Sequence, residues 1–268
     1  PLGSLAAGDT VRVFWRAAPY HEKVMLSGQG TAEQPIRFCG VPGPQGELPV
    51  LDAEGATTQP GLDFPFDGHQ PRGLVIVGHQ HGDQDYYRQP SHITIEGFEI
   101  RNAGPPFSFT DNHGQVTPYS SIAAGIFVER GDDITVRGCD IHDNYNGIFM
   151  GTGGDEKTIC KNALIESNYI HQNGSPTEYY EHNVYNEVKG IVYQFNRFGP
   201  TRNLNGNAIK ERSAGVFIRY NWVDDGAHLL DLVDAQEARD VNLPDPAFHE
   251  TFVYGNVLLR GTRNAGSI

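Results

Sequence analysis

A phenol, an amine and a carboxylate stand at corresponding positions of successive repeats in the second half of the chain. Tyr185 lies 11 residues before Asn196, and Lys210 lies 11 residues before Asn221, which gives a repeat of 25 residues. A repeat of this length is typical of one coil of a β solenoid, in which equivalent positions of paired strands lie about 4.8 Å apart. Tyr185, Lys210 and Asp231 are therefore expected to form one short column.

Other polar side chains keep fixed offsets from this column. Three residues before its members stand two histidines and an asparagine, which are His182, Asn207 and His228. Glu187 and Arg212 stand two residues after Tyr185 and Lys210, respectively. They should point to the same face as the column, because side chains alternate along a strand. The pattern therefore gathers acidic, basic and cationic groups on one surface.

These groups are the types that β-elimination of a uronate-containing glycan needs. Removing the proton beside a uronate carboxylate requires a base, a cation that neutralises the carboxylate, and a donor for the departing glycosidic oxygen. Lys210, Arg212 and Tyr185 supply these three types. Arg212, about 7 Å along the strand, should favour the neutral amine of Lys210, whereas Asp231 should favour its ammonium form. A simple ion pair between Lys210 and Asp231 is the alternative to catalysis.

Several further residues have a structural interpretation beside a functional one. His182 and His228 could act as general acids or bind sugar, and they could equally be ordinary surface histidines. The candidates for substrate binding are Arg202, Asn207 and Glu187.

Carboxylates in the same region leave other activities open. Asp231 with Asp234, Asp224 or Asp225 could form the carboxylate pair of a glycoside hydrolase, although Asp224 and Asp225 also suit a turn. Oxygen donors for calcium are present in Glu181, Glu187, Asp231 and Asp234, but no compact ligand motif is found, so a metal stays unassigned. A noncatalytic glycan-binding module is the remaining alternative.

Short β strands separated by turns must position these residues. Alternating apolar and polar residues between Asp9 and Asp52, and again from Gly73 onward, predict strands with Gly and Pro between them. When the runs are aligned, one bend position repeats and is occupied by Phe98, Cys139, Asn168, Asn196, Asn221 and Asn256. The asparagines are expected to tolerate left-handed backbone at the bends and to form an internal polar ladder.

The stacked G-I-x-V and x-N-x-I runs resemble the right-handed parallel β-helix of the pectin-lyase-like superfamily over almost all of residues 9–260. The resemblance implies an all-β fold, a single-stranded right-handed parallel β-helix that acts on carbohydrate. The aligned bends predict about seven to nine coils. A secreted or periplasmic location is expected for such a protein.

Two segments are similar to polysaccharide lyase family 6, which contains chondroitinase B and alginate lyases. One is the opening segment around Gly-Thr-Ala-x-x-Pro-Ile at residues 30–36, and the other is Ile209–Ser213 followed by Val216–Asn221. The resemblance implies that Lys210 corresponds to the catalytic lysine of that family, that the substrate is a polysaccharide or oligosaccharide, and that calcium could bridge it. Where the next coil of those lyases presents an arginine, this chain has Leu229–Val233, so the proton-transfer pair is incomplete.

The composition fits a globular chain and disfavours other classes. The 268 residues carry a formal net charge of −13, which disfavours nonspecific binding to nucleic acid or to an anionic membrane. No apolar run approaches the roughly 18 residues of a membrane-spanning helix, so membrane insertion is not expected. Cys39, Cys139 and Cys160 match neither a zinc site nor a disulfide framework and are expected to be mostly buried, inert thiols.

The two ends of this sequence are expected to differ from those of the natural protein. Pro1–Ser4 resembles the remnant of a fusion-tag protease site, and residues 5–268 are expected to form a single domain. The final coil ends without a polar cap, which predicts that the natural chain continues beyond it.

Overall fold

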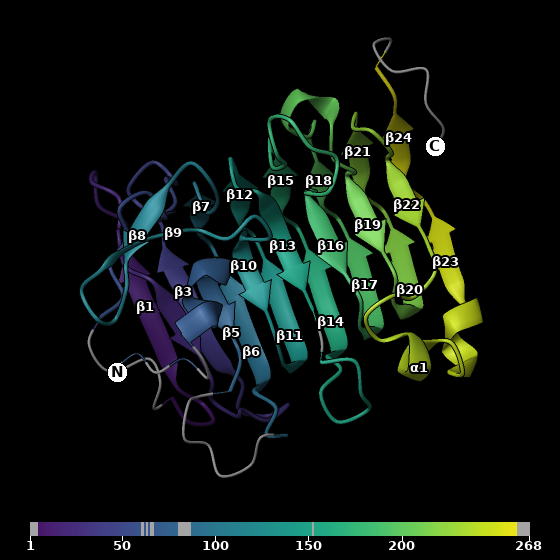
Figure 1. Ribbon diagram of the computed structural model, residues 1–268, viewed down its shortest axis with the longest axis horizontal. Helices are drawn as coiled ribbons and strands as arrows, with labels where there is room; N and C mark the ends of the chain where they lie inside the picture. Colours follow the sequence, from purple (N-terminus) through teal and green to yellow (C-terminus); the bar gives the residue numbers. More distant parts are fainter. Residues whose placement is uncertain are drawn as a thin grey trace.

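The computed structural model describes residues 5–59, 62, 64, 67–79, 87–151 and 153–261. The chain winds through stacked coils, and each complete coil contributes one strand to each of three parallel sheets (Figure 1). The expected tag remnant at Pro1–Ser4 and the terminal residues 262–268 lie outside the described residues.

The three sheets have eight, seven and seven strands. Sheet 1 contains, in spatial order, β1 (Thr10–Phe14), β3 (Ile36–Val41), β6 (Ser91–Glu96), β11 (Asp132–Arg137), β14 (Lys161–Glu166), β17 (Lys189–Gln194), β20 (Ala214–Arg219) and β23 (Thr251–Tyr254). Sheet 2 contains β2 (Val24–Leu26), β5 (Gly73–Val77), β10 (Ala124–Val128), β13 (Asn146–Met150), β16 (Val184–Asn186), β19 (Ile209–Glu211) and β22 (Leu230–Leu232). Sheet 3 contains β4 (Val50–Asp52), β7 (Glu99–Arg101), β12 (Asp140–His142), β15 (Tyr169–His171), β18 (Arg197–Phe198), β21 (Trp222–Asp224) and β24 (Val257–Leu259).

The other elements are short. β8 (Ser108–Thr110) and β9 (Val116–Pro118) form an antiparallel hairpin, and the described helices are η2 (Asp67–Arg72), η3 (Arg202–Leu204), α1 (Arg239–Asn242) and η4 (Pro246–His249). None of these helices has the length and apolar character needed to cross a bilayer. The described residues thus form seven three-stranded coils preceded by β1, which confirms the predicted all-β parallel β-helix and its coil number.

Apolar columns fill the interior of the coils. Because the strands pair in register, inward-facing residues of successive coils stack on one another. One such column on sheet 3 consists of fully buried side chains, which are Ile100, Ile141, Ile170, Phe198 and Val223. β-Branched residues suit these positions because they pack well on a pleated, buried surface, and their burial drives folding.

An asparagine ladder closes the bend between sheets 1 and 3. Asn168 Nδ2 donates to Asn196 Oδ1, and equivalent bonds link Asn196 to Asn221 and Asn221 to Asn256, each 3.0 Å long. Each accepting Oδ1 also takes the backbone N–H of the asparagine in the preceding coil. The buried polar groups are therefore satisfied by their own repeats, and the predicted ladder is confirmed.

The left-handed backbone at this bend lies one residue earlier than expected. Ser167, Phe195 and Tyr220 have φ values of 56°, 57° and 56°, whereas the asparagine that follows each of them does not have a positive φ. The asparagine side chains bridge successive coils, so the preceding residue makes the turn instead. A second ladder, which the sequence did not predict, joins Asn144, Asn173 and Asn183 at the bend between sheets 3 and 2.

The three cysteines are free thiols, as predicted. Cys139 and Cys160 are buried, and Cys39 is partly buried. Burial raises the pKa of Cys39 to about 11 and the pKa of the other two thiols to about 12. The thiolate, which is the reactive form, is therefore scarce at neutral pH.

Candidate functional site

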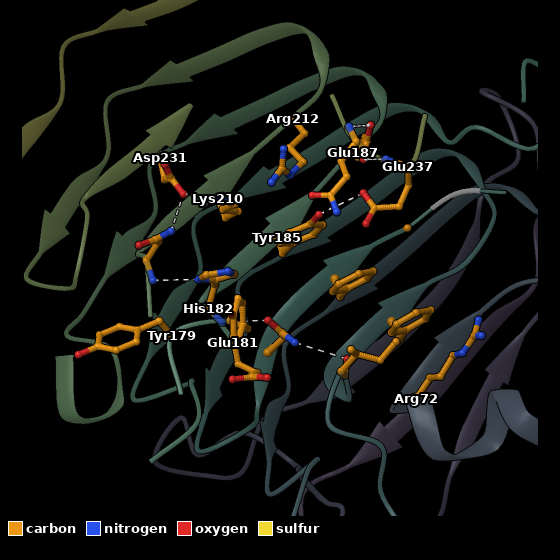
Figure 2. Close-up of a pocket in the computed structure, with 18 of the residues that line it drawn as sticks. Arg72, Tyr179, Glu181, His182, Tyr185, Glu187, Lys210, Arg212, Asp231 and Glu237 are labelled. Carbon is orange, nitrogen blue, oxygen red and sulfur yellow. Dashed lines mark hydrogen bonds and ion pairs between the residues drawn. The ribbon is translucent and has the colours of Figure 1, made fainter. Parts of the chain in front are cut away.

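A cleft of about 920 Å³ crosses the outer face of sheet 2 (Figure 2). Its floor consists of outward-facing side chains of β10, β13, β16, β19 and β22, and its walls include residues 179–181 and 236–237. Eight of the nine predicted site residues line it, namely His182, Tyr185, Glu187, Asn207, Lys210, Arg212, His228 and Asp231.

The floor of the cleft is one column of side chains in register. Phe127, Phe149, Tyr185, Lys210 and Asp231 occupy equivalent positions on successive strands of sheet 2. The first three rings stack, with centroid distances of 4.9 Å and 4.8 Å. These distances match the spacing of paired strands. The predicted column is confirmed, and an aromatic stack extends it.

Lys210 and Asp231 form an ion pair at the charged end of the column. Lys210 Nζ contacts Asp231 Oδ2, and the same oxygen accepts a hydrogen bond of 2.7 Å from Asn207 Nδ2. The side chains of the pair are only 16% and 18% exposed. The structure therefore contains the ion pair that the sequence left as an alternative. An ammonium group held in this way donates hydrogen bonds and has no lone pair to accept a proton.

His182 is a neutral imidazole of defined tautomer. Its Nδ1 accepts the backbone N–H of Asn207 at 3.0 Å, so the ring proton lies on Nε2. Burial, together with the charge of Lys210, lowers the pKa of His182 to about 3. The ring stacks beside Tyr185 with a centroid distance of 5.9 Å. At neutral pH, His182 is thus a hydrogen-bond donor next to Tyr185.

His228 has the opposite tautomer when it is neutral. Its Nδ1 lies 3.0 Å from Asn207 Oδ1. The amide orientation of Asn207 is fixed because the Asp231 carboxylate can only accept, so Asn207 presents Nδ2 to Asp231 and its oxygen to His228. His228 Nδ1 therefore donates, and Nε2 carries the lone pair.

The carboxyl groups of Glu187 and Glu237 meet at the wall opposite His182 (Figure 2). Glu187, which is 1% exposed, accepts the backbone N–H groups of Gln236, Glu237 and Ala238 at 2.8, 3.0 and 2.9 Å. Burial and a hydrogen bond with Glu237 raise the pKa of Glu187 to about 7. Burial also tends to raise the pKa of Glu237, but hydrogen bonds with Glu187 and Tyr185 outweigh it, so the pKa of Glu237 is lowered. Glu187 therefore holds the backbone of the wall in place, and Glu237 is the more readily ionised of the two carboxyl groups.

Arg212 lies above Tyr185 with an incomplete set of partners. Its guanidinium carbon is 5.9 Å from the centre of the Tyr185 ring, and Nη1 donates to the backbone oxygen of Asp234. Its Nε is buried without a hydrogen-bond partner. An unsatisfied buried donor is costly, and a bound anion would remove that cost. Arg212 is therefore suited to holding an acidic group of a ligand.

The far end of the cleft carries a further cation, Arg72. The guanidinium carbon of Arg72 lies 5.7 Å from the ring centre of Phe127, and its Nη1 lies 4.0 Å from Glu129. Glu181, also in the cleft, is 7% exposed, and its Oε2 has no hydrogen-bond partner. Burial raises the pKa of Glu181. Both ends of the cleft therefore offer charged or polar groups, with the aromatic stack between them.

A buried polar cluster supports the floor beneath Lys210. The Tyr193 hydroxyl donates to Glu211 Oε2 and accepts from Asn186 Nδ2, each at 2.5 Å. Glu211 Oε1 accepts the backbone N–H groups of Arg212 and Ser213. The cluster therefore fixes the turn that carries Arg212 into the cleft.

The Glu211 carboxyl should make stability depend on pH. Burial raises its pKa from 4.5 to about 7 in the folded protein, so between these values the folded state binds more protons than the unfolded state. The free energy of unfolding should fall by about 3 kcal/mol as the pH rises through this interval. Glu211→Gln should remove this part of the slope in denaturant titrations. An unchanged slope would mean that Glu211 is ionised throughout.

Arg202, the ninth predicted site residue, does not line the described cleft. It begins η3, and its Nη2 lies 3.4 Å from Asp143 Oδ1. The periodicity that placed the other eight residues on or beside the strands of sheet 2 does not extend to this connecting segment. Arg202 is therefore not brought together with Lys210.

The acids expected to pair with Asp231 also lie elsewhere. Asp224 accepts a hydrogen bond of 2.7 Å from Trp222 Nε1 on sheet 3. Asp225 accepts the backbone N–H of Gly226 at 3.1 Å within a turn. Asp234 pairs with Arg239 at 3.2 Å. None of these three acids belongs to the described lining of the cleft, so the hydrolase pair is not assembled.

The expected calcium ligands do not converge. Glu187 is held by three backbone N–H groups, Asp231 by Lys210, and Asp234 by Arg239. Within the described ranges, no three His, Cys, Asp or Glu side chains are grouped so that they could hold a metal ion. The described residues, with the fourth expected ligand Glu181 among them, therefore do not fit a calcium site.

Sequence reasoning missed the aromatic floor and the wall. Phe127 and Phe149 occupy the same place in the runs AGIFV and NGIFM, so an alignment carried two coils further would have found them. Glu237 and Arg72 come from segments outside the strands, where no repeat predicts position.

Residues 76–223, more than half of the chain, match the family model described as "Right handed beta helix region". The matched segment includes most of the cleft floor and ends before Asp231 and Glu237. No match was found among curated proteins. The comparison supports the fold, and it gives no support to the finer similarity with polysaccharide lyase family 6.

Proposed function

The chain belongs to the family of right-handed β-helix proteins, and from this premise we propose that its cleft binds a uronate-containing polysaccharide or oligosaccharide and cleaves it by β-elimination. One observation carries the proposal: Tyr185, Lys210 and Arg212 point into one cleft. We place the protein outside the cytoplasm, in the secreted or periplasmic space where such polymers occur.

Lys210 and Arg212 supply the positive charge that the reaction needs. Removing the proton beside a carboxylate shifts negative charge onto that carboxylate, and fixed cations stabilise this charge in a site with little water. Lys210 Nζ is paired with Asp231 Oδ2, so we assign Lys210 this electrostatic role instead of the role of base. Arg212 contributes a buried Nε that lacks a partner.

We assign Tyr185 and His182 to proton transfer and hydrogen bonding at the scissile bond. Tyr185 is adjacent to Lys210 on the neighbouring strand, and His182 presents Nε2–H beside the Tyr185 ring. A uronate carboxylate held by Lys210 would therefore lie next to both groups. The aromatic stack of Phe127 and Phe149 offers apolar surface to the sugar rings that follow.

The hydrolase alternative receives less support. Retaining and inverting glycosidases separate their two carboxyl groups by about 5 to 9.5 Å. Glu187 and Glu237 bond directly to each other, and Asp231 is paired with Lys210. Glu187, Glu237 and Asp231 therefore lack the arrangement of a glycosidase pair.

Digestion of a panel of uronate-rich polymers tests the proposal. The expected result is a loss of polymer length by size-exclusion chromatography, accompanied by near-ultraviolet absorbance from the unsaturated sugar. Shortening without absorbance would indicate a hydrolase. Retention of every polymer at full length would indicate a glycan-binding module.

A further inference from the structure

The Tyr185 hydroxyl is directed at a carboxylate that no sequence repeat predicts. It donates a hydrogen bond of 3.2 Å to Glu237 Oε2 (Figure 2). A phenol is a weak base while it keeps its proton, and its oxygen becomes a stronger acceptor when an adjacent carboxylate takes that proton. The partner of the hydroxyl therefore decides whether Tyr185 can accept a proton from substrate.

The surroundings of Glu237 keep it in place and ionised. Its backbone N–H donates to the buried Glu187, which also accepts from residues 236 and 238. The charged and titratable groups that act on Glu237 are Glu187, Tyr185 and Arg212, from two successive coils. A hydrogen bond with Glu187 and the positive charge of Arg212 each lower the pKa of Glu237. Both effects favour the carboxylate form of Glu237.

The opposite side of Tyr185 faces the groups that would hold the substrate. Lys210 lies on the next strand in register, and the His182 ring lies 5.9 Å away. Tyr185 thus stands between a proton-accepting carboxylate on the wall and Lys210 on the floor. A uronate whose carboxylate contacts Lys210 would place its acidic C–H bond near the phenolic oxygen.

We propose that Glu237 is a positioning residue that activates Tyr185 as the proton acceptor of the elimination, an inference that rests on the proposed function. The Tyr185 oxygen takes the proton from the carbon that bears the uronate carboxylate while its own proton passes to Glu237. The electrons of that C–H bond form the carbon–carbon double bond, and the bond to the glycosidic oxygen breaks. Tyr185 then protonates the departing oxygen and recovers its proton from Glu237, so no co-reactant is consumed.

Steady-state kinetics of Glu237→Gln tests this inference. The amide keeps the size of the side chain and an oxygen that accepts from Tyr185, but it cannot take up the proton. We expect kcat to fall about 100-fold with KM nearly unchanged. We also expect the loss of activity at low pH, where Glu237 would become protonated, to disappear from the profile. Glu178→Gln is the matched control, because Glu178 is exposed and outside the described lining of the cleft. Parent kcat in E237Q would overturn the inference.

A double-mutant cycle separates activation from a structural role. If Glu237 acts through Tyr185, E237Q should add little to the defect of Tyr185→Phe, whereas independent effects would multiply and contradict the inference. Should E237Q fail to fold, Glu237→Asp replaces it in the cycle. If the parent protein and E237Q produced unsaturated sugar at equal rates, this inference would be contradicted and the proposed function would stand. A parent protein that cleaves no uronate polymer would instead remove the proposed function itself.

Discussion

Replacing Lys210 with alanine should lower turnover of a uronate glycan by about 1,000-fold or more, because the variant loses a cation at the site where negative charge develops. The fold should persist, since the side chain faces the cleft and not the interior of the coil. Circular dichroism should therefore be unchanged. Lys189→Ala is the matched control: Lys189 forms ion pairs with Glu156 and Asp245 outside the described lining of the cleft, and its loss should leave turnover intact.

Lys210→Arg decides which role Lys210 has. Arginine keeps the positive charge and can still pair with Asp231, so an electrostatic role predicts a rate well above that of Lys210→Ala. A guanidinium group cannot act as a base, so the role expected from the sequence predicts that both variants fail equally. Parent activity in both variants would contradict either role and leave Lys210 as an ion-pair partner only.

Asn196→Ala should reduce the free energy of unfolding by about 3–5 kcal/mol, the largest stability effect that we expect from one ladder residue. Asn196 lies in the middle of the ladder and is 2% exposed. Its side chain accepts from Asn168 and donates to Asn221 and to the backbone oxygen of Ile165. Alanine would remove these bonds and leave the backbone N–H of Asn168 without this acceptor, whereas Asn221 Oδ1 would still accept the backbone N–H of residue 196.

Asn256→Ala is the control for this effect. Asn256 is only partly buried at the last coil, so water can replace part of its hydrogen bonding to Asn221 and Ile218. We expect a loss of about 1 kcal/mol, measured by denaturant titration. Equal losses for the two variants would show that the ladder contributes little to stability beyond its local bonds.

Repetition explains how much of the fold the sequence could predict. Parallel pairing in register brings equivalent residues of successive repeats into a column in space, so Tyr185, Lys210 and Asp231 could be aligned from the repeating pattern, although the intervals between them are 25 and 21 residues. The asparagine ladder was predictable for the same reason. The left-handed residue was misplaced because the spacing identifies the bend but not which of two neighbours makes it.

The chemistry of the cleft was less predictable because it depends on side-chain partners. The positions of His182 and His228 followed from the repeat, but their tautomers follow from the orientation of Asn207. Glu237 lies 52 residues from Tyr185 in a segment without periodicity, and its contact with Tyr185 arises only when the coils stack. Arg202 was expected to bind substrate because of its residue type, but it has no position in the repeat. Its guanidinium group lies near Asp143, away from the cleft.

Cleavage of a uronate glycan in water enriched with a heavy oxygen isotope tests the central claim most directly. β-Elimination breaks the bond without adding water, so the fragments should contain an unsaturated sugar and no label introduced by bond cleavage, as measured by mass spectrometry within minutes of mixing. Hydrolysis adds one water molecule at each cleavage. Saturated fragments that carry the heavy isotope from bond cleavage would contradict elimination and assign the cleft to a hydrolase.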